Sequence, residues 1–148
     1  MELDLSCTEV YEADLDRIVT FYMTYYNSYE GGQWSRQTTY KRIHQVWSRE
    51  DSLCLLLEHD NTLVGFSMGY FEQYDDIQAF DLVEILIDKD YQNRGVGTWF
   101  MRQIESKVKE QGGAMIQLDA VNDDSHNRFY GKLGFQKCTN LIPMSKWL

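Results

Sequence analysis

The segment 85–98 combines an apolar strand, a loop with two glycines and the start of an amphipathic helix. Gly95 and Gly97 let the backbone turn tightly and let a ligand approach without a Cβ in the way. The first N–H groups of a helix lack intrahelical acceptors, and with the helix dipole they form a site for phosphate oxygens. The segment therefore predicts a site for a ligand that contains a pyrophosphate.

Two other phosphate-binding loops do not fit this segment. The dinucleotide-binding fingerprint G-x-G-x-x-G needs a third small residue at the position that Phe100 holds. The P-loop pattern G-x-x-x-x-G-K-[ST] needs a lysine after its last glycine, and Thr98 stands there. The motif therefore belongs to neither of these nucleotide-binding classes.

Two motifs together resemble one family. Gln92-x-x-Gly95-x-Gly97 resembles the Q/R-x-x-G-x-G/A signature of the GNAT acetyltransferase superfamily. Further along the chain, Phe129-Tyr130-Gly131-Lys132-Leu133-Gly134-Phe135 resembles that family's F-Y-x-K-x-G-F segment. The motifs occur in the family's order and are joined by a helix and a strand of suitable length. The resemblance implies an N-acetyltransferase that uses acetyl-CoA as its co-substrate.

The resemblance also implies which residues bind acetyl-CoA. In the family, the strand before the loop splays away from the next parallel strand and its backbone pairs with the pantetheine arm. This role falls to Ile85, Leu86 and Ile87, while Asn122 is a further candidate, displaced by one position from the family's asparagine. The loop would hold the pyrophosphate through backbone N–H groups, and it consists of Gln92, Asn93, Arg94, Gly95, Val96, Gly97 and Thr98. Arg94 is equally compatible with a solvated surface residue.

Two residues are the candidates for acid–base catalysis. Tyr130 resembles the family's tyrosine near the thioester sulfur, and a phenol with a pKa of about 10 can protonate the departing thiolate. Asp81 lies eleven residues before Gln92, where many family members carry a carboxylate, and is the candidate base for the amine. A solvated strand-end carboxylate and a water chain remain the alternatives for this role.

Strand alternation predicts which face carries the base. Residues two apart in a strand share a face, so Asp81 is expected on the face of Val83, Ile85 and Ile87. By the same alternation, Glu84 is expected on the opposite face.

The acceptor site of the family is shaped by the first two helices and the turns between the strands. Here that region holds Tyr29, Glu30 and Trp34, with Asp75 and Asp76 in a turn. Aromatic rings and carboxylates suit a cationic amine, and the net charge of −9 agrees with this. The sequence therefore predicts acetyl transfer to the primary amine of a cationic small molecule. A protein amine and a non-catalytic acyl-CoA-binding regulatory domain are the alternatives.

Hydrophobic periodicity predicts a single α/β domain over residues 1–148. A mixed, mostly antiparallel sheet of six to seven strands with helices on both faces satisfies the order of elements. Helices are expected over 13–29, after the N-cap Ser35, after Gly97 and over 125–133. Strands are expected over 3–11, 53–58, 63–73 (with Gly65 and Gly69 inside it), 78–87 and 115–120, with one or two more in 135–148.

Composition excludes several other functions. The net charge of −9 argues against nucleic-acid binding, and no apolar run is long enough to span a membrane. The stretch Met1–Leu5 lacks the pattern of a secretory signal, so a cytoplasmic location is expected. Three cysteines without a C-x-x-C pair suggest no metal site, and Cys54 and Cys138 are expected to be buried thiols. The sequence leaves open whether the chain forms a homodimer.

Overall fold

The computed structural model describes residues 3–148, so Met1 and Glu2 of the segment 1–5, expected to lack a signal pattern, lie outside the described residues. The chain divides into two compact units, with the boundary between Leu118 and Asp119. The first unit contains the sheet and three of the helices, and the second contains a short helix and the C-terminal segment.

The first unit is built on a sheet in which the described residues form five strands, in the order β1-β2-β3-β4-β5. The first four strands run antiparallel to their neighbours, and the fifth pairs with β4 in parallel. Asp60 and Asn61, both with positive φ, make the tight turn between β2 and β3 that an antiparallel hairpin needs. The strands are β1 (Leu5–Glu9), β2 (Ser52–His59), β3 (Thr62–Gln73), β4 (Gln78–Ile87) and β5 (Met115–Gln117).

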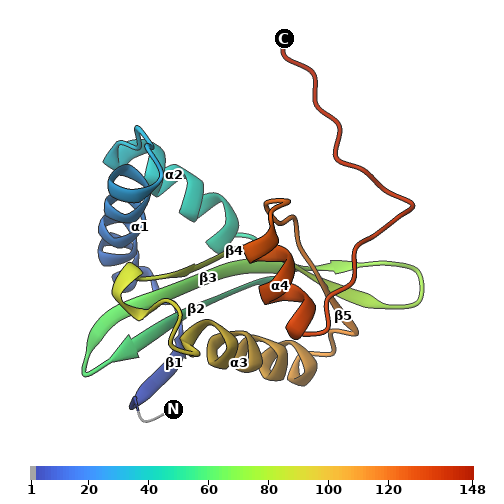
Figure 1. Cartoon of the computed structure of the whole chain (residues 1–148), viewed down its shortest axis with the longest axis horizontal. Coiled ribbons are helices and arrows are strands. Elements are labelled where there is room, and N and C mark those ends of the chain that lie inside the picture. The colour runs from blue at the N-terminus through green and yellow to red at the C-terminus, as the bar shows by residue number, and fades with distance from the viewer. Residues whose placement is uncertain (1–2) are drawn as a thin grey trace. The chain divides into compact units, whose positions relative to one another are not determined.

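Helices cover both faces of this sheet. Helices α1 (Leu15–Tyr29) and α2 (Arg36–Trp47) lie on one face, and α3 (Val96–Glu110) lies on the other (Figure 1). Helix α2 begins where the sequence predicts, because the Ser35 side chain accepts a hydrogen bond from the Thr38 N–H. Two short 3₁₀ turns, η1 (Glu12–Asp14) and η2 (Lys89–Tyr91), precede α1 and α3.

The core lies on both sides of the sheet, as alternation along the strands requires. On the side of α1 and α2, a cluster of buried residues joins the helices to β2, β3 and β4; it includes Ile18, Tyr22, Ile43, Leu56, Phe66, Met68 and Leu86. Helix α3 buries the apolar stripe that its spacing predicts, formed by Val96, Phe100, Met101, Ile104 and Val108. Cys54 is buried as expected, and burial raises the pKa of its thiol to about 12.

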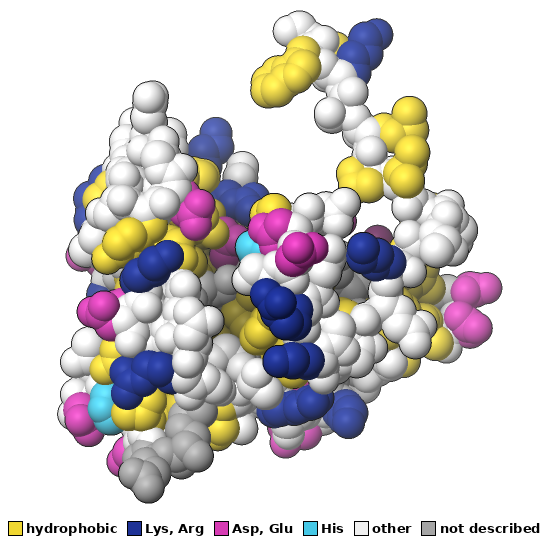
Figure 2. All heavy atoms as spheres, viewed as in Figure 1, with side chains coloured by type: hydrophobic (Ala, Val, Ile, Leu, Met, Phe, Trp, Pro, Cys, Tyr) yellow, Lys and Arg dark blue, Asp and Glu magenta, His cyan; other side chains and the backbone are white. Residues whose placement is uncertain are grey.

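The second unit consists of α4 (Asp124–Lys132) and a segment, 133–148, in which the structure has neither helix nor strand. The prediction of further strands in 135–148 was therefore wrong, and the described sheet has five strands rather than six or seven. Figure 2 shows exposed hydrophobic side chains along this segment. Ile142 and Trp147 are among the exposed residues, so no burial of these side chains offsets the entropy cost of ordering a strand. Cys138, expected to be buried, is exposed as well.

The fold class is otherwise as the sequence predicts, an α/β arrangement with a mixed, mostly antiparallel sheet and helices on both faces. The strand over 78–87 has the predicted bounds, and the other helices and strands differ mainly at their ends.

Candidate active site

A β-bulge in β4 decides which side chains share a face of the sheet. Met68 on β3 pairs with Glu84, but Gly69 pairs with Leu82, so one residue of β4 has no partner across the pair. A Cβ on Gly69 would lie 2.4 Å from the Asp81 carbonyl oxygen and 2.4 Å from the Phe80 ring, so only glycine allows this close approach.

The bulge corrects the predicted faces. Tyr70 pairs with Asp81, and because Met68 and Tyr70 are alternate residues of β3, their partners Glu84 and Asp81 lie on the same face. That face is the one that α1 and α2 cover, since Met68 belongs to the cluster beneath these helices and Tyr70 packs against it. The predictions that Glu84 lies opposite Asp81 and that Asp81 shares the face of Ile85 and Ile87 were therefore both wrong, because Ile85 and Ile87 pair with Ser67 and Gly65 on the other face and alternation inverts across a bulge.

Glu84 is held by the aromatic residues of α1. The Tyr22 hydroxyl donates a hydrogen bond of 2.7 Å to the Glu84 carboxylate, and Tyr22 is 2% exposed. Burial, and after it the charge of Glu84, raises the pKa of Tyr22 and of Tyr26, so both phenols stay protonated. The Arg42 guanidinium of α2 lies within hydrogen-bonding reach of Tyr22 and interacts electrostatically with Glu84. The carboxylate thus sits among two phenols and one cation.

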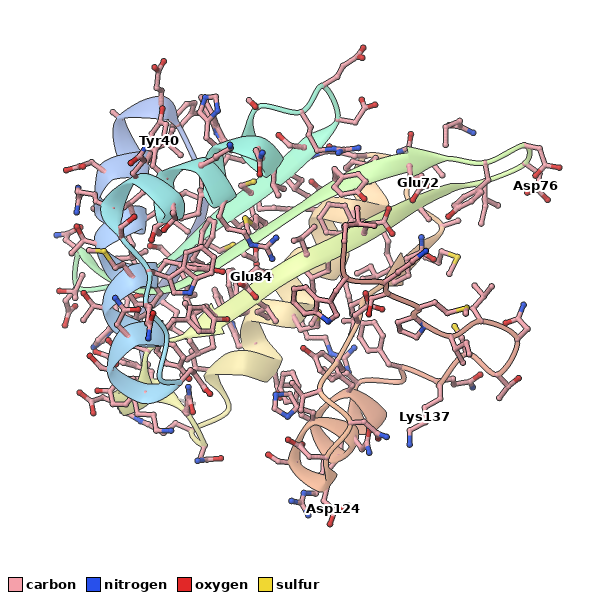
Figure 3. All side chains as sticks on the ribbon, turned by 90° about the horizontal axis from the view of Figure 1, so that it is seen from above. Tyr40, Glu72, Asp76, Glu84, Asp124 and Lys137 are labelled. Atoms are coloured by element: carbon pink, nitrogen blue, oxygen red, sulfur yellow. The ribbon has the colours of Figure 1, made fainter. Side chains whose placement is uncertain are left out.

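A side chain of β5 holds Asp81 in place. The Gln117 side-chain amide donates a hydrogen bond of 2.6 Å to Asp81 Oδ1 and also contacts the Tyr74 hydroxyl at 3.2 Å. Asp81 Oδ2 is buried and has no hydrogen-bond partner within the described residues. The Glu72 carboxyl approaches Asp81 from β3 and interacts with it directly. Figure 3, viewed from the side of α1 and α2, shows Glu84 beside α2 and Glu72 further along the hairpin toward Asp76.

The edge of β4 that faces β5 is paired over only part of its length. β5 pairs with Ala79, Phe80 and Asp81 and ends at Gln117, whereas β4 continues to Ile87. Within residues 3–148, the stretch 82–87 therefore has no strand partner on this edge. Ile85, Leu86 and Ile87 all lie in this stretch, and because Leu86 is buried in the core, its backbone rather than its side chain faces the open edge.

The loop between β4 and α3 is fixed by Gln92. Its side-chain amide lies 2.8 Å from the Tyr25 hydroxyl of α1 and donates a hydrogen bond of 2.9 Å to the Ile87 carbonyl. Gln92 therefore points into the protein and is no free donor to a ligand. Arg94 is exposed, with a hydrogen bond of 3.2 Å to the Asp90 carbonyl.

The rest of the loop ends in the first turn of α3. Gly95 is the N-cap, with φ 79° in the left-handed region that glycine adopts without strain, and Asn93 also has positive φ. In the described chain, no side chain caps this helix at Gly95, so the first N–H groups of α3 are not satisfied by a capping group. Val96 is fully buried, while Thr98 is exposed and Gly97 is half-buried. These residues fit a phosphate group by their backbone N–H groups.

The predicted acceptor residues are spread over the end of α1 and the loop after it. Tyr29 is 54% exposed, and Lys89 lies 5.5 Å from the centre of its ring. Glu30 is exposed, whereas Trp34 is half-buried with its ring packed edge-on against Tyr22 at 5.4 Å. Asp76 lies at the tip of the β3–β4 hairpin, away from these residues (Figure 3). The structure therefore does not gather the predicted carboxylates into one cluster.

The second unit carries Tyr130 and Asn122. Tyr130, on α4, packs edge-on against Phe129 and Phe135, with ring centres 5.0 and 5.5 Å apart. Asn122 is exposed and accepts a hydrogen bond of 3.2 Å from the Asn127 amide. Asp123, at the position where the family shows asparagine, is the N-cap of α4 and accepts from the His126 N–H at 2.8 Å.

Sequence reasoning missed the group formed by Tyr22, Tyr26, Arg42 and Glu84. Its members come from α1, α2 and β4, and only packing of the helices on the sheet brings them together. One signal was available, because a glycine inside a strand often marks a bulge, and Gly69 stands where the bulge forms.

Two further findings bear on function. Among the described residues, no helix is long and apolar enough to cross a membrane. Residues 3–148 also contain no cluster of histidine, cysteine or acidic side chains suited to hold a metal ion.

Two curated relatives match the chain, one of them named as an N-acetyltransferase. The chain is 22% identical over 130 residues to an uncharacterized N-acetyltransferase of Methanocaldococcus jannaschii, an alignment that covers 84% of this chain. It is 31% identical over 83 residues to the uncharacterized protein YxbD of Bacillus subtilis, which covers 55% of this chain. The chain spans about half the length of these relatives, 57% and 48% respectively.

Solved structures share the fold. A possible acetyltransferase from Clostridium difficile matches with a TM-score of 0.82 and 16% identity, over 99% of each chain. An aminoglycoside acetyltransferase from an uncultured soil metagenomic sample, in complex with sisomicin, matches with a TM-score of 0.80 and 15% identity, over 97% of this chain and 96% of that one. At such identities, the likeness concerns the fold alone.

The family model of the acetyltransferase (GNAT) family matches residues 15–135, which include both predicted motifs. The chain therefore belongs to the acetyltransferase (GNAT) family.

Proposed function

We propose that the chain is an N-acetyltransferase that moves an acetyl group from acetyl-CoA to the primary amine of a cationic small molecule. The observation that carries this proposal is the open edge of β4 leading into the uncapped first turn of α3, with Asp81 at the point where β4 and β5 part. Membership of the family makes acyl transfer the expected chemistry.

Acetyl-CoA fits the residues present. The backbone groups of Ile85, Leu86 and Ile87 can pair with the amides of a pantetheine arm along the open edge. The N–H groups of the first turn of α3, behind Gly95, can bind the pyrophosphate. When bound, acetyl-CoA supplies the acetyl group as an activated thioester.

The proposed roles of the side chains follow from the charges that change. Asp81, directly or through a water, takes one proton from the acceptor amine, so that the nitrogen lone pair can form the new N–C bond. The C–S bond breaks, and the Tyr130 hydroxyl gives a proton to the leaving sulfur. The nitrogen loses its second proton as the tetrahedral intermediate collapses, and this proton restores the Tyr130 hydroxyl through solvent. The products are an amide and a free thiol, and the proton that Asp81 accepted returns to solvent.

A cationic acceptor is supported by the charges on the face beneath α1 and α2. Glu72, Asp81 and Glu84 all point to this face. The Arg42 guanidinium interacts with Glu84 and the Arg49 guanidinium with Glu72, so two cations accompany these three carboxylates. Carboxylates and aromatic rings together attract an ammonium group. A solved aminoglycoside acetyltransferase has a similar fold, and we extend that substrate class to this chain as part of the proposal.

A panel of amines tests the proposal. We expect release of free thiol from acetyl-CoA with at least one cationic amine, measured with a thiol reagent. Cys138 is exposed and reacts with the same reagent, so Cys138→Ser is the background control. If acetyl-CoA raises the melting temperature but no amine releases thiol, the chain is a non-catalytic acyl-CoA-binding domain and the proposed activity is wrong.

A further inference from the structure

Two carboxyl groups meet on the face that the acceptor would approach. Asp81 of β4 pairs with Tyr70 of β3, and Glu72 is the next residue of β3 on that face. Diagonal neighbours across an antiparallel pair lie about 7–8 Å apart by their Cα atoms, within reach of long side chains. The Glu72 side chain has this reach, and its carboxyl interacts with that of Asp81.

The hydrogen bonds around Asp81 are incomplete unless this pair holds a proton. Gln117 satisfies Oδ1, but Oδ2 is buried and no donor among the described residues reaches it. A buried polar atom without a partner is costly. Two ionised carboxylates are both acceptors, so neither can satisfy the other, whereas one shared proton turns either carboxyl into a donor.

The charges around Glu72 also favour a shared proton. The hydrogen bond with Asp81, and then the negative charge of Asp81, raise the pKa of Glu72 above its usual range. Tyr74 and Arg49 act in the opposite direction but do not cancel this effect. Such a pair loses its protons in two steps that belong to both groups together.

The other groups that face the pair come from all the neighbouring elements. Tyr70 and Tyr74 come from β3 and the turn after it, and the Arg49 guanidinium lies 3.7 Å above the centre of the Tyr70 ring. Gln117 comes from β5, and Glu84 lies on the same face of β4 beyond the bulge. Of these, only Arg49 carries a positive charge, and it is exposed.

We propose that Glu72 is a positioning residue that shares one proton with Asp81, so that the two carboxyls accept the proton of the acceptor amine as one coupled pair. This inference rests on the proposed function, in which Asp81 is the base. The pair must first lose its shared proton; it then takes one proton from the ammonium group of the acceptor, and the nitrogen keeps the electron pair that attacks the thioester. The pair gives the proton to solvent after the product leaves.

The coupling makes a prediction about pH. In the wild type, kcat/KM should rise with pH as the pair becomes fully ionised, along a limb set by the pair rather than by a single carboxyl. Glu72→Gln replaces the carboxyl that shares the proton with an amide, which can donate a hydrogen bond to Asp81 but holds no titrating proton. We therefore expect this limb to move to lower pH. We also expect a lower plateau, because a carboxylate without the second charge is a weaker base.

The experiment compares the pH profiles of kcat/KM for the wild type, Glu72→Gln and Glu105→Gln, with the amine that the panel identifies. Glu105→Gln removes the same charge from α3, on the other face of the sheet, where Glu105 pairs with Arg102. We expect its profile to match that of the wild type. A Glu72→Gln profile that coincides with the wild type would overturn the proposal.

A measurement without substrate separates this proposal from the proposed function. In ¹³C NMR titrations of the carboxyl groups, we expect Asp81 and Glu72 to show two shared steps, and Asp81 to show one step in Glu72→Gln. Independent one-step titrations of the two groups in the wild type would overturn the coupled pair, whatever the activity. Coupled titration in a protein that acetylates no amine would support the pair and contradict only the proposed function.

Discussion

The Tyr22 hydroxyl of α1 donates a hydrogen bond of 2.7 Å to the carboxylate of Glu84 on β4. This contact ties the helix that borders the proposed acceptor site to the strand whose open edge would bind acetyl-CoA. Gln92 makes a second tie between the same elements through Tyr25. The geometry of α1 and of the cofactor strand therefore depends on the same few polar contacts.

Removing the Tyr22 hydroxyl should destabilise the protein. Tyr22→Phe keeps the ring that packs against Tyr26 and Trp34 but leaves the half-buried Glu84 carboxylate without this donor. We expect the free energy of unfolding in urea to fall by about 1–3 kcal/mol, the range for hydrogen bonds to charged groups. Tyr40→Phe, at an exposed site on α2, is the control and should change it by less than about 0.5 kcal/mol. Equal effects of the two substitutions would show that the contact contributes nothing.

A substitution of Gly95, the residue before α3, should impair cofactor binding specifically. Gly95→Val puts a branched side chain at φ 79° in the loop proposed to hold the pyrophosphate, so we expect loss of the rise in melting temperature that acetyl-CoA causes. Gly112→Val is the matched control, because Gly112 has φ +88° near the other end of α3 and open space around it. Both variants carry backbone strain, but only Gly95→Val should lose the response to acetyl-CoA. A normal response in Gly95→Val would place the phosphates elsewhere.

The general-acid role of Tyr130 predicts a selective loss of turnover. Tyr130→Phe keeps the ring contacts with Phe129 and Phe135, so α4 should still pack. We expect kcat to fall about 10²–10⁴-fold with little change in the KM for acetyl-CoA, since the hydroxyl acts on the leaving sulfur. Steady-state kinetics with saturating amine measures both constants. A wild-type kcat would remove Tyr130 from the mechanism.

The acceptor should carry at least one positive charge beyond the reacting amine. The net charge of −9 and the carboxylates of Glu72, Asp81 and Glu84 favour the approach of a cation. For such an acceptor, kcat/KM should fall as salt rises, because salt screens the attraction. Matched amines that differ only in a remote ammonium or hydroxyl group provide the comparison. Clear preference for a neutral or acidic acceptor across the panel would contradict this prediction.

The carboxyl pair should also make stability depend on pH. The pKa of Glu72 is raised in the folded protein, first by its hydrogen bond with Asp81, so its contribution to stability is present below the unfolded value of 4.5. That contribution is lost as pH rises through the folded value. Glu72→Gln removes this loss, so the melting temperature of the variant should rise relative to that of the wild type over the pH range above 4.5 in which Glu72 loses its proton. Because Glu72 is exposed, high salt should reduce the gain. A constant difference across this range would show that the two carboxyls do not interact.

Much of the cofactor half of the candidate site could be predicted from the sequence, because its signals are local. An apolar strand, two glycines and a helical repeat define the segment 85–98 without reference to the rest of the chain. The structure places the bounds of β4, the left-handed Gly95 and the buried stripe of α3 accordingly. Such features depend on backbone conformation and on periods within one element, which neighbouring residues in the sequence largely determine.

The acceptor half could not be predicted in the same way, because it depends on pairing between strands and on helix packing. One unpaired residue beside Gly69 inverts the faces of β4, so that Glu84 joins Asp81 beneath α1 and α2. The contact of Glu72 with Asp81 needs the register of β3 against β4, and the contact of Tyr22 with Glu84 needs the position of α1 on the sheet. The same limit applies to the strands expected in 135–148, because a segment becomes a strand only where it pairs with a neighbour, and this segment pairs with none among the described residues. Sequence alone determined which groups could bind and react, and tertiary structure decided which of them meet, because a strand acquires its partners and faces only when it pairs.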